Sequence, residues 1–124
     1  MDKKSILVVE DNEMIRNFLM MRLADVGFYV SSAKDGEEGL KKAKQNRPDL
    51  IILDLMLPKL SGKEVCKAIR EDREKGIASI PIIMLTSLAA EVDKVIGMVI
   101  GATRYVKKPF NTEELLFEIQ ACLA

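Results

Sequence analysis

The chain has 124 residues, of which 48% are hydrophobic and 31% are charged, and this length and composition are those of one globular domain. Lysine plus arginine and aspartate plus glutamate both number 19, so the formal net charge is +0, and because no basic block stands out we expect no nucleic-acid partner. No apolar run is long enough for a transmembrane helix or a signal peptide, which predicts a cytoplasmic protein without a membrane partner.

Strand and helix patterns alternate in the first half of the chain. The strand patterns are short and apolar, whereas the helix patterns repeat apolar residues at i, i+3 and i+4. The strand pattern before residue 34 has mixed polarity, which is typical of the edge of a sheet. In order, the segments are a strand over Ser5–Val9, a helix over Glu13–Val26 that Asn12 caps and Gly27 ends, a strand over Phe28–Ala33, and a helix that starts at Lys34-Asp35-Gly36 and ends before Pro48.

The run Leu50–Leu53, followed by Asp54, is the centre of the pattern. Four consecutive apolar residues between Pro48 and Pro58 predict a strand that is buried on both faces, as in the middle of a parallel sheet. An unpaired carboxylate inside such a strand would cost on the order of several kcal/mol. We therefore expect Asp54 at the point where the strand emerges and the chain turns, which is where open α/β sheets bind their ligands.

The second half of the chain continues the alternation. Cys66 and Cys122 fall on separate helix patterns without metal-binding spacing, so we expect both to be packing residues. The last helix opens with Asn111-Thr112-Glu113-Glu114, which is typical of a capping box. The segments are a helix that runs to about Lys75 and ends at Gly76, a strand over Ile80–Ser87, a very apolar helix over about Ala90–Ile100 followed by Gly101, a strand over Arg104–Lys108, and a helix with the apolar residues Leu115, Leu116, Ile119, Cys122 and Leu123.

Five strands that alternate with five helices predict the α/β class, with a five-stranded parallel sheet that is doubly wound. Right-handed crossovers and the flavodoxin-like strand order 2-1-3-4-5 put the first and third strands side by side. The third and fifth helices then cover opposite faces of the sheet, which separates Cys66 from Cys122. We expect residues 1–124 to form a single domain without an output domain, either as a stand-alone protein or as an excised part of a longer one.

Acidic, hydroxyl and basic side chains follow the strand patterns, at one edge of this sheet. Three carboxylates in one crevice repel each other, and a divalent cation, a lysine or a shared proton relieves the repulsion. The chain has no histidine, and oxygen ligands alone favour a hard cation such as Mg²⁺. Because neighbouring strand residues face opposite ways, Lys108 rather than Lys107 should point into the site. The set comprises Glu10 and Asp11 after the first strand, Asp54 on the third, Thr86 on the fourth and Lys108 on the fifth.

Short motifs along essentially the whole chain together resemble the receiver domain of two-component response regulators, of the chemotaxis response-regulator type. The motifs are Val9-Glu10-Asp11-Asn12, Leu53-Asp54-Leu55-Met56-Leu57-Pro58, Leu85-Thr86-Ser87, Gly101-Ala102 and Tyr105-Val106-Lys107-Lys108-Pro109-Phe110. The resemblance implies a phosphoprotein of a phosphorelay, which takes a phosphoryl group from a sensor histidine kinase or a phosphotransfer protein and then contacts a downstream protein target. It implies no enzyme activity beyond the chain's own phosphorylation and dephosphorylation.

The resemblance also implies a role for each residue of the site. Asp54 would accept the phosphoryl group, Thr86 would bind it, and Lys108 would pair with it. Tyr105 would move together with Thr86 as the switch. The downstream partner would bind a face made of the fourth helix, the fifth strand and the fifth helix. The Mg²⁺ ligands would be Glu10, Asp11, Asp54 and the backbone carbonyl of Met56.

Two rival interpretations remain open. An enzyme or cofactor protein on this fold lacks support, because neither Gly-x-Gly-x-x-Gly nor Gly-x-x-x-x-Gly-Lys-Ser/Thr occurs and Met56 stands where aspartate phosphatases place a second acid. A receiver-like interaction module that is never phosphorylated would not need the five-residue set.

Thr103-Arg104 stands where many receivers have two acids before the aromatic residue, which argues against an ion-paired dimer face.

Overall fold

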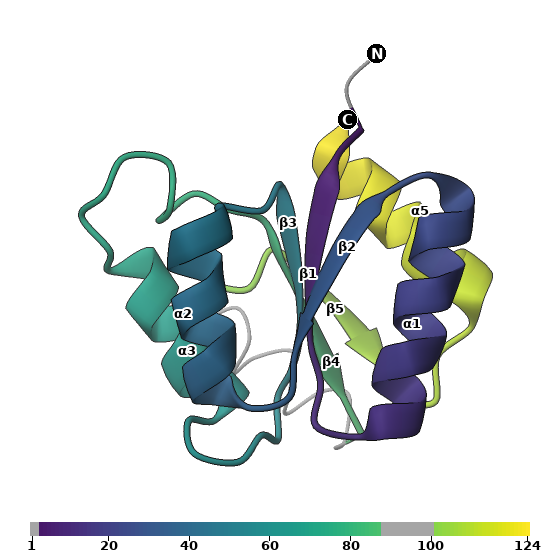
Figure 1. The fold of residues 1–124 in the computed structure, drawn as a ribbon, viewed down its shortest axis with the longest axis horizontal. Coiled ribbons are helices and arrows are strands. Elements are labelled where there is room, and N and C mark those ends of the chain that lie inside the picture. Colours follow the sequence, from purple (N-terminus) through teal and green to yellow (C-terminus); the bar gives the residue numbers. More distant parts are fainter. Residues whose placement is uncertain (1–2, 88–100) are drawn as a thin grey trace.

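The computed structural model describes residues 3–87 and 101–124, which form a sheet flanked by helices on both faces (Figure 1). All described strand pairs are parallel, and the strand order is β2-β1-β3-β4-β5. This confirms the doubly wound α/β fold with the flavodoxin-like order. The strands are β1 (Ser5–Val9), β2 (Tyr29–Ala33), β3 (Leu50–Asp54), β4 (Ile82–Thr86) and β5 (Arg104–Lys107), and the helices are α1 (Glu13–Val26), α2 (Gly36–Asn46), α3 (Gly62–Arg70) and α5 (Thr112–Leu123).

Two apolar clusters fill the spaces between the sheet and its helices. Helices α2 and α3 cover one face of the sheet, and α1 and α5 cover the other (Figure 1). Every residue of β3 is buried, whereas the edge strand β2 is only partly buried, as its mixed polarity predicts. The central strand is therefore anchored on both faces, which fixes the position of the residue at its end.

The two cysteines lie on opposite faces of the sheet, as the topology predicts. Cys66 is buried in the cluster under α2 and α3, and Cys122 packs against the cluster under α1 and α5. Both are free thiols, and burial raises the pKa of each above its ordinary value. Raised pKa values keep thiols protonated and unreactive at neutral pH, in keeping with packing residues.

The helix caps follow the sequence signals. The side-chain oxygen of Asn12 accepts a hydrogen bond from the amide of Ile15 and so begins α1, which ends at Gly27 with a left-handed φ of 113°. Asn111 caps α5 in the same way, accepting from the amides of Glu113 and Glu114. Only three residues separate β1 from α1, so these caps hold the loops at the carboxyl edge of the sheet in defined positions.

Helix α3 is shorter than its sequence predicts, because it ends at Arg70 and not near Lys75. Past this point the carboxylate of Asp72 accepts a hydrogen bond from the amide of Glu74 at 2.8 Å, a local contact that competes with continuation of the helix. Gly76, expected to end the helix, instead lies in the following loop with a φ of 89°.

Contacts distant in sequence stabilise this early end. The guanidinium of Arg70 donates to the carbonyl oxygens of Ala78, Ile80 and Gly101. Ile77 is completely buried in the cluster under α2 and α3, which requires the loop to fold back toward the sheet. A continued helix would forgo both the hydrogen bonds of Arg70 and the burial of Ile77.

Smaller differences concern the strand ends. Strand β2 begins at Tyr29, one residue late; β4 begins at Ile82, after Pro81, and ends at Thr86; and β5 ends at Lys107, one residue before Lys108.

The predicted helix over Ala90–Ile100 lies outside the described residues. No helix among residues 3–87 and 101–124 has the length and apolar character that a membrane span requires.

Candidate functional site

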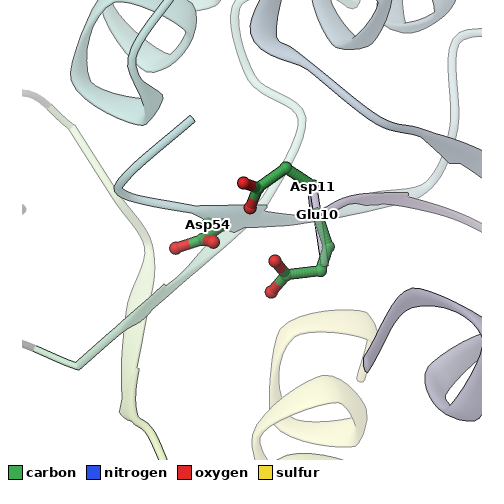
Figure 2. Close-up of side chains that lie close together, drawn as sticks. All are labelled: Glu10, Asp11 and Asp54. Atoms are coloured by element: carbon green, nitrogen blue, oxygen red, sulfur yellow. The ribbon is translucent and has the colours of Figure 1, made fainter. Parts of the chain in front are cut away.

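The carboxyl ends of β1 and β3 lie side by side and bring three acidic side chains together (Figure 2). Carboxylate oxygens of Glu10, Asp11 and Asp54 all lie within 4.8 Å of one another. Glu10 is 1% exposed and Asp54 is 4% exposed, whereas Asp11 is open to solvent. Buried carboxylates at this spacing require a positive charge nearby.

Lys108 supplies one such charge. Its ammonium lies 2.6 Å from a carboxylate oxygen of Glu10 and 3.0 Å from one of Asp54. Burial by itself lowers the pKa of Lys108, but the hydrogen bonds and negative charges of these two carboxylates outweigh burial and raise the pKa above its ordinary value of 10.5. Lys108 therefore keeps its positive charge throughout the neutral pH range, while the neighbouring Lys107 is exposed.

The turn that follows β1 is held by several side chains. The second carboxylate oxygen of Glu10 accepts a hydrogen bond from the amide of Asn12 at 3.1 Å. The guanidinium of Arg16, one turn into α1, donates to the backbone carbonyl oxygens of Glu10 and Asp11. No local sequence pattern distinguishes Arg16 from Arg22, the other basic residue of α1, so its role emerges only from these contacts.

The loop that follows β3 carries Met56. Its amide donates to a carboxylate oxygen of Asp54 at 3.2 Å, and its side chain is 61% exposed, so the residue contributes only its backbone to the site. Within this loop Lys59 has a left-handed φ of 69°. A non-glycine residue in that region carries strain that the surroundings must impose.

Helix α2 imposes that loop conformation. The amide of Gly36 donates to the carbonyl oxygen of Pro58 at 3.2 Å, and the ammonium of Lys59 lies 3.7 Å from a carboxylate oxygen of Asp35, the N-cap of α2. A Cβ at position 36 would lie only 1.9 Å from the carbonyl oxygen of Leu60. Only glycine permits this close approach between helix and loop, a constraint that the sequence pattern does not reveal.

Thr86 and Tyr105 lie on the neighbouring strands. Thr86 is the buried last residue of β4, one residue beyond Leu85, which is the register partner of Asp54. Tyr105 on β5 is half-buried and packs against the cluster under α2 and α3 rather than lying at the acidic cluster. Thr86 thus shares the carboxyl edge with Asp54, and Tyr105 lies farther back along the sheet.

The donor set fits a hard divalent cation. Three carboxylates face one ammonium, a formal charge of −2, and every candidate ligand atom in the group is an oxygen. A hard dication prefers oxygen ligands and would relieve the remaining repulsion. The arrangement can therefore bind such an ion and hold the carboxylate of Asp54 at the edge of the sheet.

Comparison with known proteins gives consistent results. Residues 6–120 match the model of the response regulator receiver domain. The alkaline phosphatase synthesis transcriptional regulatory protein PhoP of Bacillus subtilis is 48% identical over 120 residues, which are 97% of this chain and 48% of PhoP. The chain spans about half the length of the curated relatives it matches.

Solved structures share this fold. The chemotaxis protein CheY4 of Vibrio cholerae has a TM-score of 0.90 at 38% identity, and the match covers 98% of this chain and 100% of CheY4. The BeF3-activated receiver domain of DrrB has a TM-score of 0.86 at 32% identity, with 98% of each chain covered.

Proposed function

The chain belongs to the family of response regulator receiver domains, and from this premise we propose that it accepts a phosphoryl group on Asp54 from a sensor histidine kinase or a phosphotransfer protein. A carboxylate oxygen of Asp54 would attack phosphorus as the phosphorus–nitrogen bond of a phosphohistidine breaks. The imidazole takes up one proton from solvent as it leaves, so the products are an acyl phosphate on Asp54 and a neutral histidine on the donor. The observation that best supports this proposal is the nearly buried carboxylate of Asp54, held by Lys108 beside two further acids.

The neighbouring residues have roles that their positions support. The ammonium of Lys108 would neutralise charge on the transferred group, and the hydroxyl of Thr86 would hydrogen-bond to it. Glu10, Asp11, Asp54 and the carbonyl of Met56 would hold Mg²⁺. When bound, this ion would supply charge neutralisation at the phosphoryl oxygens. The protein catalyses only its own phosphorylation and dephosphorylation under this proposal.

The proposed output is a change in a protein-binding face. Phosphorylation would bias Thr86 and Tyr105 between two arrangements, and this population shift would alter a face that includes β5 and α5. The fourth helix predicted for the same face lies outside the described residues. On this face Arg104 pairs with Glu118 of the same chain at 3.6 Å. A downstream protein in the cytoplasm, and no nucleic acid or membrane, is the partner we propose.

A mass measurement tests the phosphoacceptor. The protein would be incubated with acetyl phosphate and Mg²⁺, and we expect the intact mass to rise by one phosphoryl group in the parent and not in Asp54→Asn. Asp49→Asn is the matched control, because Asp49 lies at the opposite end of β3, where it accepts a hydrogen bond from the amide of Ser5. Modification of Asp54→Asn at the parent rate would show that another residue is the acceptor. A parent that gains no mass would favour the interaction module that is never phosphorylated.

A further inference from the structure

Arg16 makes contacts that the proposed chemistry does not yet use. One nitrogen of its guanidinium donates to the carbonyl oxygen of Glu10 at 2.9 Å and to that of Asp11 at 3.3 Å. The backbone amide of Arg16 donates to the carbonyl oxygen of Asn12, so its side chain starts from an ordered helical turn. A single donor group thus joins two consecutive peptide planes of the turn that carries the acidic cluster.

These carbonyl oxygens lie where the sheet no longer supplies donors. Strand β1 ends at Val9, and the chain turns away toward α1 over the next three residues. Exposed peptide groups in a turn can rotate unless a partner holds them, and a charged donor forms the stronger kind of hydrogen bond. By fixing the peptide planes on both sides of the Asp11 Cα, Arg16 limits the directions in which the Asp11 side chain can point.

The guanidinium of Arg16 binds backbone carbonyl oxygens rather than the carboxylates of the cluster. Among residues 3–87 and 101–124, the ion pairs that involve the acidic cluster are made by Lys108, and none joins Arg16 to Asp11. An arginine that paired with Asp11 would compete with a metal ion for the same oxygens. Here the guanidinium binds backbone oxygens instead, so it orients Asp11 without occupying its carboxylate.

We infer that Arg16 is a positioning residue for the divalent cation: it holds the turn after β1 in the conformation that directs Asp11 toward Glu10 and Asp54. The inference rests on the proposed function, since it concerns the same metal site. It assigns to the first helix a part in metal binding that the acidic residues alone do not describe.

The sign of the effect of mutation separates this role from a simple charge effect. If Arg16 acted only through its charge, its removal would lessen repulsion of Mg²⁺, and the metal would bind more tightly. If Arg16 positions Asp11, its removal loosens the site, and we expect about tenfold weaker binding, as for other residues that orient metal ligands. The two explanations therefore predict opposite changes in the dissociation constant.

The experiment compares three variants by following backbone amide signals in an NMR titration with MgCl₂. Arg16→Met removes the charge and the donors, and Arg16→Lys keeps the charge but replaces the planar guanidinium with an ammonium on a more flexible stem. Arg22→Met is the matched control, because it removes the same charge from the same helix nearly two turns farther from the site. We expect Mg²⁺ to bind about tenfold more weakly to Arg16→Met, to bind Arg16→Lys with intermediate affinity, and to bind Arg22→Met as it binds the parent.

A second measurement uses the metal-free protein. The amide of Asn12 donates to Glu10 at 3.1 Å, and it should exchange with solvent faster in Arg16→Met than in the parent, while amides in the middle of α1 keep their rates. Binding to Arg16→Met as tight as to the parent, or tighter, would overturn the inference and leave the phosphoacceptor proposal intact. A parent that binds no Mg²⁺ would instead overturn the proposed metal site, and this inference with it.

Discussion

The two segments that bring the acidic cluster together are held by different kinds of contact. The turn after β1 depends on charge, because Lys108 binds Glu10 and Arg16 binds the backbone of Glu10 and Asp11. The loop after β3 depends chiefly on fit, because Gly36 lets helix α2 approach the loop backbone more closely than any side chain allows, and the ion pair of Lys59 with Asp35 is exposed on the lysine side. Charged contacts respond to pH, salt and bound cations, whereas steric fit responds only to size. The turn after β1 is thus the adjustable half of the site, and the loop after β3 is the rigid half.

Removing the ammonium of Lys108 should give the largest effect and act on the adjustable half. We expect Lys108→Met to lower the free energy of unfolding by about 3 kcal/mol, since it leaves the nearly buried Glu10 and Asp54 unpaired. Added Mg²⁺ should restore part of that loss, because a dication can take the place of the ammonium. Urea unfolding with and without MgCl₂ measures both the loss of stability and its recovery. Lys107→Met, at the exposed neighbouring lysine, is the control and should change the free energy of unfolding little. Equal losses of stability in Lys107→Met and Lys108→Met would contradict the prediction.

Adding one methyl group at position 36 should break the rigid half. Gly36→Ala would force the loop after β3 away from α2, at a cost of about 2 kcal/mol. The loss should be the same at low and high salt, unlike the loss in Lys108→Met.

Gly76→Ala is the control for a glycine substitution elsewhere in the chain. Position 76 has a positive φ of 89° and open space around it, whereas Gly36 is constrained only by its close contact with Leu60, so Gly76→Ala costs about 1 kcal/mol of backbone strain without moving the loop. Heat denaturation at two salt concentrations distinguishes the variants. A salt-dependent loss in Gly36→Ala would mean that charge, and not fit, holds the loop.

Lys59 allows a finer test of the rigid half. Its left-handed φ of 69° is strained for lysine, so Lys59→Gly should be more stable than Lys59→Ala by about 1 kcal/mol. Both variants lose the ion pair with Asp35, which is exposed on the lysine side, so the difference between them isolates the backbone conformation. Unfolding midpoints of the two variants suffice for this test. Equal midpoints would show that the loop relaxes freely and that α2 does not impose its conformation.

Alkaline pH should give the smallest effect, again on the adjustable half. The pKa of Lys108 is raised in the folded protein, so its stabilising contribution is complete below about 10.5, the pKa of an ordinary lysine, and is lost as the pH rises through the higher folded value. The difference in unfolding free energy between the parent and Lys108→Met should therefore be constant through neutral pH and shrink only above about 10.5. Unfolding curves at several pH values up to this range measure the difference. A difference that shrinks near neutral pH would contradict the raised pKa.

The sequence was sufficient to predict the sheet and the gathering of acids at its edge. The apolar runs before Glu10 and Asp54 are uninterrupted, and parallel strands bring residues at their ends together whatever the details of the helices. Placing Lys108 in the site required only the alternation of neighbouring side chains. These inferences succeeded because they depend on local patterns and on general rules of chain topology.

The contacts that hold the site were beyond the sequence pattern. Arg70 ends α3 through carbonyl groups that lie between 8 and 31 residues away, and the closeness of Gly36 to Leu60 joins segments that have no pattern in common. Arg16 resembles any basic residue on an exposed helix until the carbonyl oxygens of Glu10 and Asp11 are seen beside it. Such contacts depend on the path of the backbone in space, which periodicity does not specify.

The pairing of Glu10 with Lys108 also affects when the site can form as the chain is synthesised and folds. The two residues are 98 positions apart, near the two ends of the chain, and so the contact closes a loop that includes most of the domain. Closing so long a loop costs more chain entropy than closing a short one, and such contacts slow folding. During synthesis, a chain that ends before Lys108 carries its acids without their lysine. The acidic cluster therefore gains its lysine only once the segment after β5 is in place, and an incompletely folded chain lacks the arrangement on which the proposed phosphorylation of Asp54 depends.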